Sequence, residues 1–181
     1  MYNTQAGSGT IVWKARKLLA TGEIDEEEFI KIVVDATTYP GFCNTMGTAT
    51  TMNSLAEGLG MSLPGCAAIP APLSERIEMS YRTGLRIVEM VKKDLTPSKI
   101  LTRKAFENSI VLNSAIGGST NAPIHINAIA RHVGVELEIE DWEKIGLEIP
   151  MLVNMQPGGK YLGEDFHRAG GVPAVMNALL K

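Results

Sequence analysis

Glycine pairs and near-pairs divide this chain into short segments. They stand at positions 7 and 9, 117 and 118, 158 and 159, and 170 and 171, among eighteen glycines in 181 residues. Glycine adopts backbone conformations that other residues avoid, so such positions favour sharp turns or the close approach of another group. Between them, apolar residues recur every three or four positions. The chain is therefore predicted to fold as helices joined by tight, glycine-rich corners.

Capping and breaking signals predict where these helices begin and end. Asp25 followed by Glu28 is a capping-box pattern, and Gly60 is a C-terminal stop. A turn is predicted at 39–41, where proline and glycine are adjacent. The predicted helices span residues 10–20, 25–34, 45–59, 74–94, 102–115, 121–132, 140–145 and 172–180.

Two further segments complete the predicted fold. Residues 63–72 contain three prolines and are not expected to be regular helix throughout. Residues 151–155, between Pro150 and Pro157, are the best candidate for a strand. We therefore expect an α/β fold class, rich in helix and with few strands of its own.

The segment 74–94 carries the clearest helical pattern in the chain. Its apolar side chains recur at helical spacing, and charged side chains fill the other face. The apolar positions are Ile77, Tyr81, Leu85, Val88 and Val91, and the charged ones are Glu75, Arg76, Arg82, Arg86 and Lys92.

Composition limits the classes of function. The chain is 45% hydrophobic and 20% charged, which is ordinary for a globular protein with one core. Its net charge of −3 argues against binding nucleic acid or acidic lipid. No apolar run approaches the roughly 20 residues that span a bilayer, and no secretory signal begins the chain. The two cysteines do not suggest a secreted disulfide scaffold, so we expect reduced thiols and a cytoplasmic protein.

Cys43 is the leading candidate for chemistry, because it is predicted to lie where a loop becomes a helix. A helix N-terminus carries unpaired N–H groups and partial positive charge, which favours the thiolate that ligates metal or attacks carbon. The alternative is a buried structural cysteine. The residues that follow favour the first interpretation, since polar and β-branched side chains are poor helix formers. They are Asn44, Thr45, Thr48, Thr50 and Thr51.

One cysteine does not complete a metal site, because zinc and iron–sulfur sites use up to four ligands. Cys66 comes 23 residues after Cys43, and the chain has no C-x-x-C pair. Three histidines are present, each better explained as a surface or satisfied core residue: His125, His132 and His167. The pattern alone therefore does not show a closed metal site.

A second polar cluster follows Gly117 and Gly118. Ser119, Thr120 and Asn121 stand at the start of a predicted helix, whose dipole favours an anion. The equal alternative is a plain glycine break followed by one capping residue. Asp165 and His167 are a weaker candidate for an acid–base pair, and a solvated helix end is the favoured interpretation there.

These motifs together resemble the dihydroxy-acid dehydratase and phosphogluconate dehydratase family over essentially the whole chain. The resemblance is strongest at residues 43–71 and 117–121 and at the glycine corners 157–159 and 170–173. Residues 44–52 read N-T-M-G-T-A-T-T-M, which is similar to the sugar-acid branch that acts on arabinonate, xylonate and related acids.

The resemblance implies a hydro-lyase that converts a 2,3-dihydroxy sugar acid into a 2-keto-3-deoxy acid. It implies an iron–sulfur cluster, [2Fe–2S] rather than [4Fe–4S], and a magnesium ion. Cys43 matches the last of the family's three cluster-ligating cysteines, and Cys66 matches a position that is not a ligand. Asn44, Thr45 and Thr48 are then candidates for supporting the cofactor. Ser119, Thr120 and Asn121 are candidates for lining the same pocket.

The chain also departs from the family pattern. The other two cluster cysteines, the Cys-Asp-Lys segment that binds magnesium, a metal-binding glutamate and the proposed serine base have no match here. We therefore expect residues 1–181 to be a partial N-terminal iron–sulfur domain, with no second domain and no activity alone. The family implies a homo-oligomer, and a complementing chain is another partner to consider. The alternative is a non-catalytic helical module or relic that associates with other chains.

Overall fold

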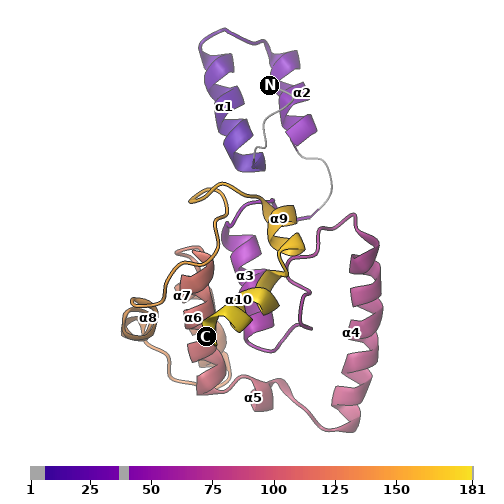
Figure 1. Ribbon diagram of the computed structural model, residues 1–181, viewed down its shortest axis with the longest axis vertical. Coiled ribbons are helices and arrows are strands. Elements are labelled where there is room, and N and C mark those ends of the chain that lie inside the picture. Colours follow the sequence, from indigo (N-terminus) through magenta and orange to yellow (C-terminus); the bar gives the residue numbers. More distant parts are fainter. Residues whose placement is uncertain (1–6, 37–40, 181) are drawn as a thin grey trace.

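The computed structural model describes residues 7–36 and 41–180, and within these ranges the fold is almost entirely helical (Figure 1). The turn predicted at 39–41 lies mostly outside the described residues. No helix in the described ranges is long and apolar enough to cross a membrane. The helices are α1 (Ser8–Ala20), α2 (Glu26–Ala36), α3 (Thr48–Gly58), α4 (Ser74–Lys92), α5 (Pro97–Ile100), α6 (Arg103–Ile116), α7 (Ala122–His132), α8 (Ile139–Gly146), α9 (Gly163–Arg168) and α10 (Gly171–Leu179).

The body of the protein is built around α6. Phe106, Ile110 and Leu112 on this helix are completely buried, and α3, α7, α8 and α10 contact it. Its ends agree with the sequence signals: the Thr102 hydroxyl accepts a hydrogen bond from the Ala105 amide at 3.3 Å, and Gly117 ends the helix with φ of 61°. The core therefore forms where the helical periodicity and the capping signals coincide.

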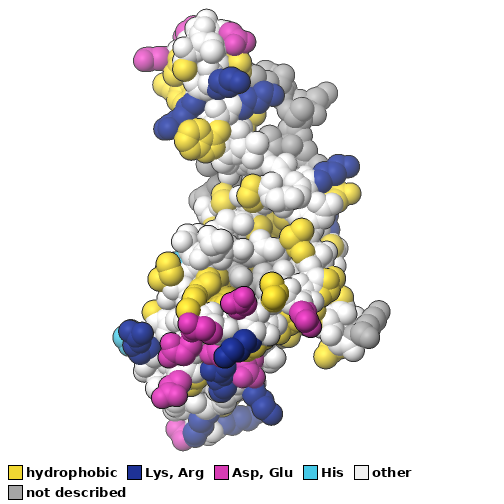
Figure 2. All heavy atoms as spheres, turned by 90° about the vertical axis from the view of Figure 1, so that its left-hand side faces the viewer, with side chains coloured by type: hydrophobic (Ala, Val, Ile, Leu, Met, Phe, Trp, Pro, Cys, Tyr) yellow, Lys and Arg dark blue, Asp and Glu magenta, His cyan; other side chains and the backbone are white. Residues whose placement is uncertain are grey.

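Helices α1 and α2 form a hairpin with a small core of its own, built on Ile11, Ala15 and Ile32. Asp25 accepts a hydrogen bond from the Glu28 amide at 2.8 Å, as the capping pattern predicts. Figure 2 shows the hairpin projecting from one end of the body, with Lys and Arg side chains lying among Asp and Glu side chains toward the opposite end of that face.

The strand predicted for residues 151–155 is wrong. The amides of Leu152 and Val153 both donate to the carbonyl of Ala115, at 2.7 and 3.3 Å, at the end of α6. Met155 forms one isolated bridge with Tyr161, and the described ranges contain no strand. A strand needs a neighbour to accept its ladder of hydrogen bonds. The helix-rich part of the prediction therefore holds, whereas the α/β class is not confirmed.

The apolar side of α4 faces solvent in this structure. Ile77 is 76% exposed, Tyr81 69% and Val91 75%, and Met79 is the one buried residue of the helix. Figure 1 shows α4 standing to one side of the other helices. The sequence thus predicts the helix and its two faces, but the apolar face has no partner among the described residues.

Glu57, near the end of α3, fixes the proline-containing segment that follows. Its buried carboxylate accepts hydrogen bonds from the amides of Gly65 at 2.6 Å and Ala67 at 2.8 Å. Burial raises the pKa of Glu57 above its ordinary value of 4.5, and the two backbone hydrogen bonds oppose that rise. One side chain therefore holds the turn that carries Cys66.

A second polar anchor joins α6 to α8. The Arg103 guanidinium contacts Asp141 at 2.9 Å and Glu107 at 2.9 Å, and it donates to the Glu136 carbonyl at 2.7 Å. Asp141 also accepts from the Glu138 amide at 2.9 Å, which caps α8. The hydrogen bonds from Arg103 and then from Glu138 lower the pKa of Asp141 below its ordinary 3.8.

Replacing Glu57 with glutamine tests the first anchor. The folded protein binds the Glu57 proton more strongly than the unfolded chain, so the contribution of Glu57 to stability is largest below pH 4.5 and falls as pH rises through its raised pKa. Glu57→Gln places an amide N–H₂ opposite a backbone donor, and we expect it to cost about 1–3 kcal/mol at pH 4 and less at pH 7. Denaturant titrations of both proteins at the two pH values measure this difference. A cost that grows with pH contradicts the assignment.

Asp141→Asn should show the opposite dependence. A carboxylate with a lowered pKa stabilises the fold above its unfolded value of 3.8, and that contribution is lost as pH falls through the folded value. Since both the ion pair and the helix cap weaken, we expect a loss of about 1 kcal/mol at pH 7 that diminishes as pH falls through the lowered pKa of Asp141. Thermal or urea unfolding of both proteins, at pH 7 and at acidic pH, measures the stability lost on substitution. An equal loss at the two pH values means that Asp141 acts without its charge.

Candidate functional site

Cys43 lies in the loop that precedes α3, four residues before the cap residue Gly47. The helix was predicted to start at Thr45, but it starts at Thr48. The reason is the Thr50 hydroxyl, which donates to the carbonyls of Thr45 at 2.7 Å and Cys43 at 3.3 Å and so holds the loop in a non-helical conformation.

The Cys43 sulfur nevertheless lies beside the start of α3. A Cβ placed on Gly47 would be 3.8 Å from Sγ, so the cap residue passes close to the sulfur. The Thr45 hydroxyl is within hydrogen-bond distance of Sγ, at 3.3 Å. Cys43 itself is exposed, whereas Thr45 is buried. The arrangement presents an accessible thiol whose position is set by a buried hydroxyl group.

Asn44 connects this loop to two distant parts of the chain. Its side-chain oxygen accepts from the Ser8 amide at 3.1 Å, in the first turn of α1. Its carbonyl accepts from the Gly163 amide at 2.8 Å, at the start of α9. Asn44 thus satisfies a free donor at a helix N-terminus and helps to fix the backbone on which Cys43 stands.

We call the cavity beside Cys43 the cysteine pocket. It has a volume of about 340 Å³ and contains both cysteines of the chain. Arg76, on α4, donates to the Cys66 sulfur at 3.5 Å and to the Ile69 carbonyl. The residues that line the cysteine pocket are Gly41, Phe42, Cys43, Asn44, Asn53, Ala56, Ser62, Cys66, Ala67, Ala68, Pro70, Ala71, Arg76 and Gly163.

Residues 117–121 form a hydrogen-bonded corner against the first turn of α3. The hydroxyls of Thr48 and Ser119 are 3.1 Å apart, and the Asn121 amide group donates to Thr48 at 2.8 Å. The Ser119 backbone amide donates to the Thr51 hydroxyl at 3.0 Å. A Cβ on Gly118 would lie 2.9 Å from the Thr51 methyl carbon, so this approach needs glycine.

A second cavity, which we call the hydroxyl pocket, opens beside this corner. It has a volume of about 400 Å³, and Thr48, Ser119 and Thr120 line it together with Gly47. Cys43 and Asn44 line the cysteine pocket instead. The sequence predicts one pocket for all of these residues, whereas the structure places Cys43 and Asn44 at one cavity and Thr48, Ser119 and Thr120 at another, and Thr45 and Asn121 line neither of the two. Gly47 lies beside both the Cys43 sulfur and the hydroxyl pocket.

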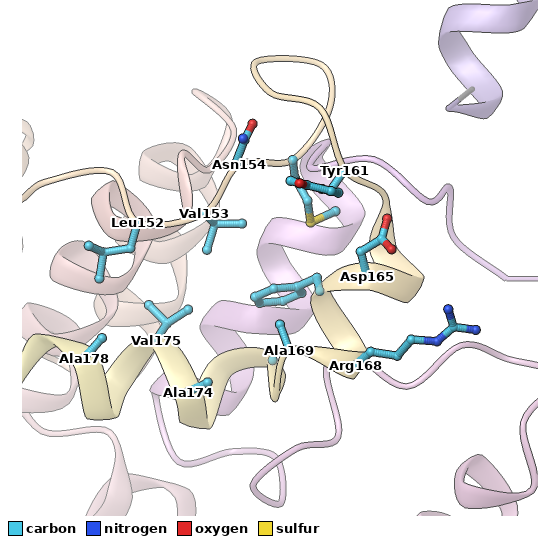
Figure 3. A pocket seen from close by; sticks show the side chains of 13 residues that line it. Leu152, Val153, Asn154, Tyr161, Asp165, Arg168, Ala169, Ala174, Val175 and Ala178 are labelled. Carbon is cyan, nitrogen blue, oxygen red and sulfur yellow. The ribbon is translucent and has the colours of Figure 1, made fainter. Parts of the chain in front are cut away.

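A third cavity was not anticipated from the sequence. It is an apolar groove of about 420 Å³ between residues 152–155 and helices α9 and α10 (Figure 3). Val153, Phe166 and Val175 line it, and Asn154, Tyr161 and Asp165 add polar groups. The small apolar side chains of α10 are the only local signal that indicates such a groove.

Asp165 and His167 have separate partners. Asp165 accepts from the Leu162 amide at 3.0 Å, which caps α9, and His167 lies 3.5 Å from the Glu75 carboxylate on α4. His125 and His132 are exposed. The described residues contain no group of three or more Cys, His, Asp or Glu side chains arranged to hold a metal ion. Of the Cys, His, Asp and Glu side chains in the described residues, only those of Cys43 and Cys66 line the cysteine pocket.

Comparisons with known proteins identify the family to which this chain is similar. Residues 1–181 match the family described as dihydroxy-acid/6-phosphogluconate dehydratase, N-terminal. The chain is 58% identical over 179 residues to D-xylonate dehydratase of Caulobacter vibrioides, covering 99% of this chain and 30% of that protein.

Two further relatives show the same coverage. L-arabinonate dehydratase of Rhizobium leguminosarum bv. trifolii is 51% identical over 175 residues, 97% of this chain and 30% of that protein. Dihydroxy-acid dehydratase of Caldanaerobacter subterraneus is 46% identical over 170 residues, which cover 94% of this chain and 31% of that protein. The chain spans about 30% of the length of these curated relatives, and it belongs to the dihydroxy-acid/6-phosphogluconate dehydratase family, matching its N-terminal region.

Proposed function

We propose that this chain contributes the Cys43 loop and the adjoining pockets to a cytoplasmic sugar-acid dehydratase. The observation that carries the proposal is the exposed thiol of Cys43, held by Thr45 at the mouth of a pocket, in a chain 58% identical to a D-xylonate dehydratase. The substrate is a 2,3-dihydroxy sugar acid, which loses water to give a 2-keto-3-deoxy acid.

Cys43 supplies one thiolate ligand to an iron–sulfur cluster, of the [2Fe–2S] type. Bound iron and Mg²⁺ supply Lewis-acid chemistry that helps a hydroxyl group leave. The remaining cluster ligands and most Mg²⁺ ligands come from outside the described residues, which hold no complete metal-binding group. Such a partial donor set fits a domain that shares its cofactor site with other segments of an α/β protein.

The neighbouring residues position the thiolate. The Thr45 hydroxyl lies 3.3 Å from the sulfur, within reach to donate to a thiolate, and Thr50 fixes the carbonyls of the same loop. Asn44 fixes the loop from the side of α1. These contacts reduce the number of conformations that the Cys43 side chain must give up when it binds iron.

The hydroxyl pocket binds the polyol part of the substrate. Ser119 and Thr120 line this pocket and supply donors and acceptors of the kind that sugar hydroxyls need. Thr48 bonds to Ser119, and Asn121 supports the same corner from beside the pocket through its hydrogen bond to Thr48. Gly47 lies next to both the sulfur and this pocket. The cofactor and the substrate hydroxyl groups therefore meet at the first turn of α3.

One observation favours a second function, that of a helical module without catalysis. The apolar side of α4 is exposed over the whole helix, as in a domain that associates with another chain. In that case the chain takes up no iron and accelerates no dehydration in any context.

A chimaera separates these functions. This chain replaces its matching segment in the Caulobacter D-xylonate dehydratase, and iron, sulfide and D-xylonate turnover are measured after anaerobic purification. We expect the chimaera to hold a cluster and to dehydrate D-xylonate, whereas the 181-residue chain alone does neither.

Two substitutions in the chimaera assign the ligand. Cys43→Ser removes the proposed thiolate and should abolish cluster binding, while the matched control Cys66→Ser should leave iron and sulfide nearly unchanged. Unchanged iron in Cys43→Ser rules the assignment out. Loss of iron in Cys66→Ser alone means that the other thiol of the cysteine pocket is the ligand.

A further inference from the structure

Helix α4 carries an apolar stripe that the body of the protein does not use. Ile77, Tyr81, Gly84, Val88 and Val91 follow one another at intervals of four, three, four and three residues, and all are exposed. This is the spacing at which two helices form a coiled-coil seam. Leu85 and Ile87 extend the stripe on its two sides and are also exposed.

The opposite face attaches α4 to the body. Met79 is buried, Arg86 and Met90 are half-buried, and Arg76 reaches the Cys66 sulfur and the Ile69 carbonyl. The helix is thus held from one side, and the seam on its other side is exposed.

Gly84 lies in the middle of the seam without an evident reason inside this chain. Glycine in a helix interior costs about 1 kcal/mol relative to alanine. A Cβ at this position would have no other atom within 4 Å, so nothing in the body requires glycine there. Glycine at a helix surface permits another backbone to approach closely.

We propose that α4 pairs in antiparallel orientation with α4 of a second copy of this chain. In the seam register, Tyr81 packs against Val91 of the other copy, and Gly84 packs against Val88. Leu85 and Ile87 each meet their own counterpart across the two-fold axis. A two-fold contact requires a surface that complements itself, and this arrangement satisfies that requirement.

Charges beside the seam select the antiparallel orientation. Glu78 and Lys92 occupy equivalent flanking positions two heptads apart, and both are exposed. An antiparallel pair places Glu78 of each copy beside Lys92 of the other, forming two ion pairs. A parallel pair places the two copies of this flank on opposite sides of the seam, so Glu78 and Lys92 do not meet and neither ion pair forms.

This inference goes beyond the proposed function, because it concerns assembly and holds whether or not the chain binds a cluster. The competing occupant of the seam is another segment of a longer polypeptide, since the relatives are about three times as long as this chain. A single helix pair lies at the small end of specific interfaces, so we expect a Kd on the order of 10 µM.

Sedimentation equilibrium of the 181-residue chain tests the pairing. The wild-type chain should fit a monomer–dimer equilibrium, and Glu78→Lys or Lys92→Glu should each raise Kd at least about fivefold, since each replaces two attractive pairs by two repulsive ones. The double variant restores both pairs and should return Kd to within about twofold of the wild type. Lys93→Glu is the matched control, because it makes the same charge change at an exposed residue on the side of the helix opposite the seam, and it should leave Kd unchanged.

A substitution within the seam separates loss of pairing from loss of folding. Val88→Glu should give a monomer with the helical circular-dichroism signal of the wild type. A wild-type chain that stays monomeric at several hundred micromolar overturns the proposal and assigns the seam to another segment. Larger aggregates without a dimer plateau, or a double variant as weak as the single ones, overturn it as well.

Discussion

The hydroxyl groups at the start of α3 are the contacts on which the candidate site depends. Thr50 holds the carbonyls of the Cys43 loop, Thr48 bonds to Ser119 and Asn121, and Thr51 accepts from the Ser119 backbone amide. One helical turn therefore fixes two loops that are about seventy residues apart in sequence. Threonine is a poor helix former, so its use at three of the first four positions of α3 lowers local helix propensity in exchange for these contacts.

The sequence predicts elements whose signals are local and fails where the partner is distant. The bounds of α4 and α6 follow from apolar spacing, from Thr102 as a cap and from Gly117 as a stop. The start of α3 was placed three residues too early, because the Thr50 hydroxyl competes for the carbonyls that an earlier turn would use. Residues 151–155 have the composition of a strand, but no neighbouring strand accepts their hydrogen bonds within the described ranges.

For the candidate site too, the sequence predicts what has a local signal and misses what depends on distant contacts. Sequence analysis selects Cys43 and the 117–121 corner, but no sequence rule reveals that Thr48 joins them or that they line two pockets rather than one. Glu57 was overlooked, since its amide partners at Gly65 and Ala67 lie in a loop with no regular pattern. The exposed side of α4 was equally hidden, because periodicity identifies an apolar face without saying what covers it. The match to about 30% of each relative is consistent with surfaces that are completed by other chain segments or copies.

Locating iron directly is the most decisive measurement for this account. Crystals of the chimaeric dehydratase, grown without oxygen, allow anomalous diffraction at the iron absorption edge to place the metal relative to the α3 threonines. Our account predicts an iron peak at bonding distance from the Cys43 sulfur, with the Thr45 hydroxyl still hydrogen-bonded to that sulfur. Iron peaks confined to other parts of the protein, with the Cys43 thiol free in its pocket, would contradict it.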